Sequence, residues 1–206
     1  MAEQREFFFR RLHSLLGVVP IGIFLVQHLF VNHFVVYGEE AFNTAAGFMA
    51  NLPFVLVLET LVIYLPILFH AILGVYIVFT SRYSTRRYGF FRNWMFALQR
   101  FTGIFLVVFI AWHVIETRVQ IGLGNAEADY SLMEGILTST PMFWFYVVGV
   151  LSAVFHFANG LWSFLVTWGI TQTPKSQRIS TYVCLIVFLA VGYLGVRSLL
   201  AFAYGV

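Results

Sequence analysis

The chain has 206 residues, of which 60% are hydrophobic and only 10% are charged. A water-soluble domain of this length cannot cover so many apolar side chains, so the composition excludes a soluble protein. The net charge of +3 is small, and it does not indicate nucleic-acid binding. The single cysteine, Cys184, excludes an internal disulfide framework and a cysteine-ligated zinc or iron–sulfur site built by this chain alone.

Five apolar runs follow one another along the chain, and each is long enough to cross a bilayer as a helix. We expect transmembrane helices over residues 12–37, 54–80, 98–120, 141–169 and 181–204. The first run is too long for the core of a signal peptide, so we expect it in the mature protein. Because the connections are short, residues 1–206 are predicted to form a single all-α integral membrane domain with no separate soluble catalytic domain.

Positive charges are unequally divided between the two sides of the membrane that these helices would cross. Ten of the twelve Lys and Arg residues precede the first helix, or lie between the second and third or the fourth and fifth: Arg5, Arg10, Arg11, Arg82, Arg86, Arg87, Arg92, Arg100, Lys175 and Arg178. Arg118 and Arg197 lie at the other ends, together with most of the acidic residues. The positive-inside rule therefore predicts a multi-pass protein of the cytoplasmic membrane with its N-terminus in the cytoplasm.

Five of the six histidines lie inside the apolar runs, where polar side chains are costly and tend to be functional. With a rise of about 1.5 Å per residue, His28 and His113 fall in the outer halves of the first and third helices. His70 and His156 fall in the inner halves of the second and fourth. Depth therefore groups four imidazoles into an outer pair, His28 and His113, and an inner pair, His70 and His156.

The sequence around the inner pair is repeated. His70 is followed four residues later by Gly74, and His156 by Gly160, so each glycine lies on the same helix face as its histidine. A glycine one turn away leaves space for a flat macrocycle to approach the backbone. A weaker similarity between the flanks of the first and third helices extends the repeat, which indicates a pseudo-twofold axis along the membrane normal.

Two level-matched histidine pairs fit two haems b stacked across the membrane, each iron held by two imidazoles. The outer iron would be bound by His28 and His113, and the inner iron by His70 and His156. Such an iron has no open position, so it would carry single electrons rather than activate oxygen. Zinc fits less well because no level-matched Asp or Cys supplies a third ligand. A histidine-lined transporter or metal-handling helix bundle is the alternative from another class.

Haem propionates are anions, and they need cationic or hydroxyl partners near the membrane surface. The candidates for the inner haem lie on the side predicted to be cytoplasmic: Arg10, Arg11, His13, Ser14, Arg100 and Lys175. His13 and Ser14 are the closest of these to the apolar run, so they are the first to test.

Several stretches of the chain resemble one known family. They are residues 5–17, 27–29, 32–34, 98–103, 112–114, 155–163, 167–170 and 177–182. Over nearly the whole chain, the sequence resembles the di-haem cytochrome b558 membrane anchors of succinate:menaquinone oxidoreductases, the complex II enzymes of Gram-positive bacteria. The length, the five helices and the positions of His28, His70, His113 and His156 all agree with that family.

The resemblance implies a membrane anchor whose first four helices form the haem-binding bundle. It implies two partners, a flavoprotein subunit that oxidises succinate and an iron–sulfur subunit that relays the electrons. The inner haem would receive electrons first, and the outer haem would lie nearer the site of menaquinone reduction. No succinate site would belong to this chain. An anchor for a fumarate reductase or another dehydrogenase is the alternative within electron transfer, because the sequence does not set reduction potentials.

Menaquinone reduction consumes two protons with two electrons, so its site needs protonatable side chains in the outer half. Glu59 is the only carboxylate well within a span, and His33 lies at a similar depth with Asn32 and Glu116 nearby. His33 cannot share the helix face of His28, because five residues turn a helix by about 140°. Glu59 and His33 are therefore the candidates for the quinone site.

Overall fold

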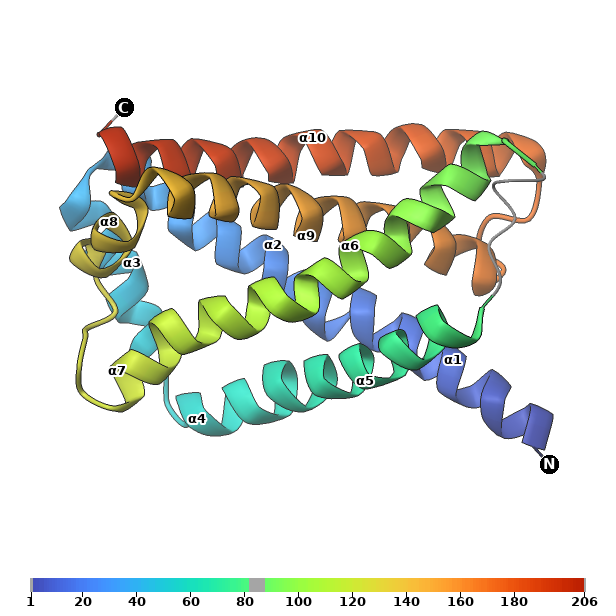
Figure 1. Ribbon diagram of the computed structural model, residues 1–206, viewed down its shortest axis with the longest axis horizontal. Helices are drawn as coiled ribbons and strands as arrows, with labels where there is room; N and C mark the ends of the chain where they lie inside the picture. The colour runs from blue at the N-terminus through green and yellow to red at the C-terminus, as the bar shows by residue number, and fades with distance from the viewer. Residues whose placement is uncertain (1, 82–87, 206) are drawn as a thin grey trace.

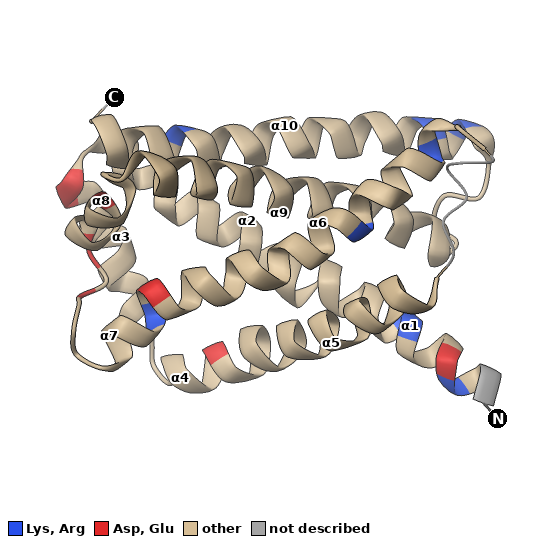
Figure 2. Ribbon diagram, in the orientation of Figure 1, with Lys and Arg blue, Asp and Glu red and all other residues tan. Residues whose placement is uncertain are grey.

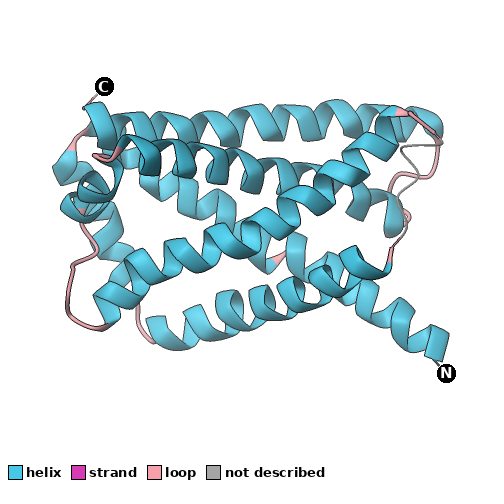
Figure 3. Ribbon diagram, viewed as in Figure 1, coloured by secondary structure: helices cyan, strands magenta, loops and turns pink. Residues whose placement is uncertain are grey.

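The computed structural model describes residues 2–81 and 88–205, which form helices joined by short loops (Figures 1 and 3). Five segments are long and apolar enough to cross a membrane: Gln4–Tyr37, Val55–Thr80, Phe91–Gly122, Thr140–Thr167 and Pro174–Tyr204. The two termini lie at opposite ends of the molecule, as an odd number of crossings requires (Figure 1). The prediction of an all-α protein with five membrane-crossing helices is confirmed.

The first crossing is built from three helical pieces: α1 (Ala2–Val18), α2 (Pro20–Asn32) and the 3-10 helix η1 (His33–Tyr37). The break between α1 and α2 falls at Pro20, which has no N–H to continue the helical hydrogen bonds. The crossing ends at Gly38, whose φ of +107° is a conformation that glycine adopts without strain.

The second and third crossings each contain a π-helical segment near the same end of the molecule (Figure 1). The second consists of α4 (Val55–Leu58), the π-helix η2 (Glu59–Tyr64) and α5 (Leu65–Thr80), and the third of α6 (Phe91–Val114), the π-helix η3 (Ile115–Val119) and α7 (Gln120–Gly122). π-Helical turns are rare and frequently mark functional sites. This end of the second and third crossings is therefore a candidate functional region.

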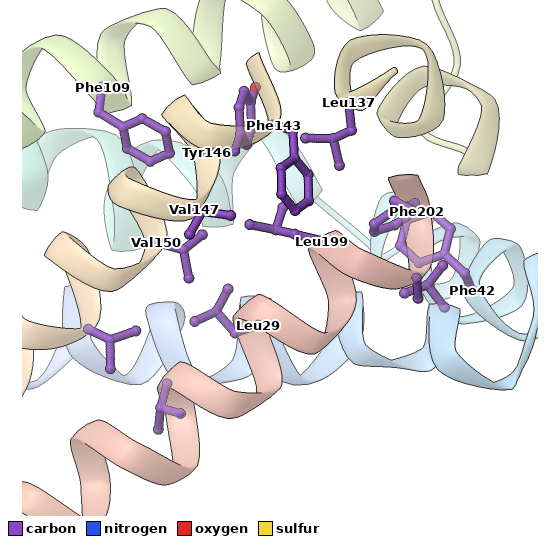
Figure 4. Packing of buried hydrophobic residues seen from close by; sticks show 14 of the residues in the cluster. Leu29, Phe42, Phe109, Leu137, Phe143, Tyr146, Val147, Val150, Leu199 and Phe202 are labelled. Atoms are coloured by element: carbon purple, nitrogen blue, oxygen red, sulfur yellow. The ribbon is translucent and has the colours of Figure 1, made fainter. Parts of the chain in front are cut away.

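The fourth and fifth crossings, α9 (Thr140–Thr167) and α10 (Pro174–Tyr204), lie side by side along their length (Figure 1). With α2 and α6 they contribute much of the apolar core, including Leu29, Val150 and Leu199 (Figure 4). A Cβ built at Gly195 of α10 would collide with Val150, so this glycine lets the two helices approach closely. Close approach at Gly195 and aromatic contacts such as that of Phe202 with Phe42 both hold the fifth helix in place.

Two shorter helices that the hydropathy does not predict cover one end of the molecule, α3 (Glu39–Ala50) and α8 (Tyr130–Leu137). The Asp129 carboxylate caps α8 by accepting a hydrogen bond from the Leu132 N–H at 3.1 Å. The Tyr130 N–H donates to Asn43 Oδ1 of α3 at 2.8 Å, which ties the two helices together.

Three crossings begin earlier than predicted, because hydropathy marks only the apolar part of a helix. The expected starts are residues 12, 98 and 181, whereas α1, α6 and α10 begin at Ala2, Phe91 and Pro174. Local contacts stabilise the polar N-terminal turns of two of these helices. In α10, Thr173 and Ser176 form a reciprocal capping box, and in α1 Arg10 pairs with Glu6 at 2.8 Å.

Charges are gathered at the two ends of the helices (Figure 2). Most basic ribbon segments lie at the end that carries α1 and the turn into α10, and acidic segments are concentrated at the end that carries α3 and α8. Arg82, Arg86 and Arg87 lie outside the described residues. The cytoplasmic location of the N-terminus stays a prediction based on this distribution.

Candidate functional site

The structure places the rings of the four histidines in two opposed pairs. The ring centroids of His28 and His113 are 5.9 Å apart with an interplanar angle of 71°, and those of His70 and His156 are 6.2 Å apart at 79°. A bond from imidazole nitrogen to metal is about 2.0 Å, so two rings on opposite sides of one metal ion have centroids about 6 Å apart. Both separations therefore suit one ion held between two imidazoles.

In three of these four rings, the Nδ1 atom has a hydrogen-bond partner. The Nδ1 atom of His70 lies 3.0 Å from the backbone carbonyl of His13, and that of His156 lies 3.2 Å from Thr102 Oγ1. The Nδ1 atom of His113 lies 3.3 Å from the Tyr146 hydroxyl. Metal-binding histidines regularly donate one ring N–H in this way, which fixes the ring and leaves Nε2 for the metal.

Two glycines allow the inner pair to lie against neighbouring backbones. A Cβ built at Gly17 would be 2.5 Å from His70 Cε1, and one built at Gly103 would be 3.1 Å from His156 Cε1. The glycines that follow the inner pair in sequence face other side chains. A Cβ at Gly74 would be 3.2 Å from His13 Cε1, and one at Gly160 would be 3.4 Å from Gln99 Nε2.

His13 is the polar residue most closely associated with the inner pair. Its ring stacks on His70 with centroids 3.8 Å apart and an interplanar angle of 11°. Its Nδ1 is buried and has no hydrogen-bond partner among the residues that the structure describes. A buried nitrogen without a partner costs free energy, so an anionic group bound here would compensate for the burial. Ser14, the next residue, is half-buried on the same helix.

The cationic candidates differ in their surroundings. Arg100 is buried, with 5% of its surface exposed, and its guanidinium lies 4.0 Å from the Phe96 ring centroid. The Arg11 guanidinium lies near two aromatic rings, 5.3 Å from the ring centroid of Trp168 and 4.9 Å from that of Phe7. Arg10 is exposed and paired with Glu6, and Lys175 is exposed. Burial makes Arg100 the best placed of the four to meet an anion inside the bundle.

The two quinone-site candidates have partners on different helices. The Glu59 carboxylate in η2 receives hydrogen bonds from Arg118 in η3, from Nε at 3.0 Å and from the terminal nitrogen at 2.8 Å. This pair joins the two π-helical segments. His33 Nδ1 lies 3.3 Å from the carbonyl of Leu194 in α10 and 3.5 Å from Ser198 Oγ. The sequence places Arg118 at the outer end of a helix but does not identify it as the partner of Glu59.

Thr102 and Tyr146 are further site residues that no pattern in the sequence indicates. Both carry hydroxyl groups inside apolar runs, and that signal is weak because such groups also satisfy the backbone. No group of three or more His, Cys, Asp or Glu side chains able to hold a metal ion occurs within residues 2–81 and 88–205. The site of interest is therefore the two histidine pairs.

Fold and site together define an integral membrane helix protein with two opposed imidazole pairs inside its membrane-crossing segments. Residues 83–195 match the family model described as "Succinate dehydrogenase/Fumarate reductase transmembrane subunit". The chain is also 57% identical over 202 residues to the "Succinate dehydrogenase cytochrome b558 subunit" of Bacillus subtilis (strain 168), an alignment that covers 98% of this chain and 100% of the relative. The chain belongs to the family of succinate dehydrogenase/fumarate reductase transmembrane subunits, and the resemblance identified from its sequence is confirmed.

Proposed function

We propose that this chain anchors a bacterial succinate dehydrogenase in the cytoplasmic membrane and carries electrons through two haems b to menaquinone. The observation that carries the proposal is the spacing of the two imidazole pairs, 5.9 and 6.2 Å between centroids. The name of the Bacillus subtilis relative supports both the enzyme and the type of cytochrome. Its high identity also favours succinate oxidation over fumarate reduction as the physiological direction.

The four histidines would hold the haems, with His28 and His113 on the outer iron and His70 and His156 on the inner iron. Each haem held by such a histidine pair would supply one-electron transfer. If Nε2 of each ring holds the group, Nδ1 of His70 would donate to the His13 carbonyl, and Nδ1 of His156 would donate to the Thr102 hydroxyl. These bonds fix the ring orientation and make each imidazole a stronger ligand.

The inner haem propionates would be bound on the side of α1. His13 is suited to this role because its buried Nδ1 lacks a protein partner among the described residues. The buried Arg100 guanidinium would supply the charge, and Ser14 and Arg11 lie on the same helix as His13. Gly74 lies close to His13, and Gly160 lies close to Gln99. Because neither glycine carries a side chain, both would leave space between the helices at these positions.

The proposal includes partners that contain the rest of the enzyme. A flavoprotein subunit would oxidise succinate, and an iron–sulfur subunit would pass the electrons to the inner pair. This chain would contribute no succinate site, because the described residues outside the crossings form only short helices and turns. Membrane lipid surrounds the apolar faces of the five crossings.

The test is to purify the complex through a tag on the flavoprotein and measure haem per copy of this chain. We expect two haems b per chain, with haem reduction on addition of succinate. A complex with one haem, or a colourless chain that does not co-purify with the flavoprotein, would contradict the proposal. The second outcome would favour a transporter or metal-handling bundle.

For the quinone site we propose Glu59 as the first protonatable side chain to test, with His33 second. Replacing Glu59 with Gln keeps the shape and one oxygen that can accept from Arg118, but it removes the negative charge and the ability to take up and release a proton. We expect menaquinone reduction to fall at least about tenfold, because general acid–base groups typically contribute about 10²-fold or more. The measurement compares succinate oxidation with a menaquinone analogue and with a soluble dye that accepts electrons directly from the flavoprotein.

The matched control is Glu40→Gln, since Glu40 is an exposed carboxylate at the start of α3. It should leave both rates unchanged. Equal quinone turnover in the Glu59→Gln variant and the unmodified complex would remove Glu59 from the site. The same assay applied to His33→Asn then decides the second candidate.

A further inference from the structure

One histidine of the outer pair is connected to a carboxylate through a tyrosine. His113 Nδ1 lies 3.3 Å from the Tyr146 hydroxyl, and that hydroxyl donates to Glu116 Oε2 at 3.0 Å. Trp112 Nε1 donates to the same carboxylate oxygen at 2.9 Å. If Nε2 of His113 binds iron, Nδ1 carries the hydrogen, and the donors form a series that runs from imidazole to hydroxyl to carboxylate.

Packing holds the members of this series in place. Tyr146 of α9 is 2% exposed, and its ring lies 5.5 Å from that of Phe109 (Figure 4). Phe109 in turn stacks on His113 with an interplanar angle of 12°. Glu116 belongs to the π-helical segment η3, and Trp112 lies one turn before it in α6. A tyrosine fixed in the core thus has its hydroxyl between the imidazole and the carboxylate.

The inner pair has neutral partners at the corresponding positions. His70 Nδ1 contacts the backbone carbonyl of His13, and His156 Nδ1 contacts the Thr102 hydroxyl. That hydroxyl donates to the Leu98 carbonyl at 2.8 Å, so the series from His156 ends on the backbone. The charged end of the His113 series therefore distinguishes the outer pair from the inner pair.

We propose that Tyr146 and Glu116 are positioning residues that lower the reduction potential of the outer haem by acting through His113; this inference depends on the function proposed above. A carboxylate at the end of the series attracts the Nδ1 hydrogen of His113 and increases the electron density on its ring. A more electron-rich imidazole stabilises ferric iron relative to ferrous iron, so the outer haem is harder to reduce. Trp112 keeps the carboxylate oriented toward the tyrosine.

The experiment is a potentiometric titration of the whole complex, followed by haem absorbance and electron paramagnetic resonance, with Tyr146→Phe and Glu116→Gln. Both variants should bind two haems, and the outer haem should become easier to reduce. At the potential where the unmodified outer haem is half reduced, we expect the ratio of reduced to oxidised haem to rise about tenfold, which corresponds to 59 mV for one electron. A net hydrogen bond to a charged group has about this effect on an equilibrium.

Thr102→Val is the matched control, because it removes the hydroxyl partner of His156 and should move only the inner haem. The inference is overturned if both variants leave the outer potential unchanged, or if Glu116→Gln shifts it and Tyr146→Phe does not. It is also overturned if both haems shift together, since that result indicates a general structural change. If His28 and His113 variants retain the full haem content, the proposed function itself fails, and this outcome is distinguishable from the others.

Discussion

Replacing His156 with alanine is expected to remove the inner haem from this protein and to leave the outer haem bound. The His156 ring lies 6.2 Å from the ring of His70, so its loss leaves one imidazole on that iron. Mutation of residues that only orient a metal ligand costs about 10–100-fold in metal affinity, so losing the ligand itself should cost more. We expect haem content to fall from two to one per chain and electron transfer from succinate to menaquinone to fall more than about 100-fold.

His13 should not rescue this variant. Its ring is stacked 3.8 Å from that of His70, which places it beside His70 rather than opposite. The measurement is haem content by pyridine haemochrome, together with resonance spectra that distinguish the two sites. His33→Asn is the control for haem content, since the His33 ring contacts the Leu194 carbonyl of α10 and belongs to neither pair. Two normally bound haems in the His156→Ala variant would contradict the assignment.

The overall fold is well predicted by the sequence because lipid permits few alternatives. Five apolar runs require five helices, and a fixed rise per residue places each histidine at a depth. His28 and His113, which are 85 positions apart in the sequence, are at similar depth, and the structure places their rings 5.9 Å apart. Depth is sufficient to predict this histidine pair, because residues in all helices that cross the bilayer can be compared by their position along the membrane normal.

Rotation about the helix axis is the quantity that the sequence does not supply. Glu59 and Arg118 can both be assigned to the outer side, but their pairing depends on the direction in which η2 and η3 present them. A π-helical turn changes that direction, and no residue pattern in these runs predicts one. The same limit applies to Tyr146, whose contact with His113 requires the relative rotation of α6 and α9.

The sequence also does not predict the short helices α3 and α8, and the reason is different. α8 has only eight residues, too few to give a clear apolar period, although Asp129 before it is a typical N-cap residue. The hydrogen bond from the Tyr130 N–H of α8 to Asn43 joins segments far apart in the chain. Local signals therefore suffice for the start of such a helix, but its docking depends on tertiary contacts.

Replacing Gly17 with leucine is expected to displace the inner haem while the outer haem stays bound. A Cβ at this position would lie 2.5 Å from His70 Cε1 and 2.9 Å from its Nδ1. The ring has little freedom to retreat, since its Nδ1 is held 3.0 Å from the carbonyl of His13 on the same helix. Accommodating the leucine therefore requires breaking that bond and moving the ring relative to His156. Overpacking of this kind typically costs about 1–3 kcal/mol, which is enough to lower occupancy of a precisely spaced site.

Two other glycines provide a graded comparison for the Gly17→Leu variant. Gly103→Leu should weaken the inner haem less, because its Cβ would lie 3.1 Å from His156 Cε1, a smaller overlap. Gly47→Leu should have no effect on either haem, because a Cβ there meets nothing within 4 Å. Haem content and the resonance signal of the inner site, measured on the purified complexes, should therefore decrease from Gly47→Leu to Gly103→Leu to Gly17→Leu. Equal inner-site signals in all three complexes would show that the His70 ring does not need the space left by Gly17, and the proposed geometry of the inner pair would have to be abandoned.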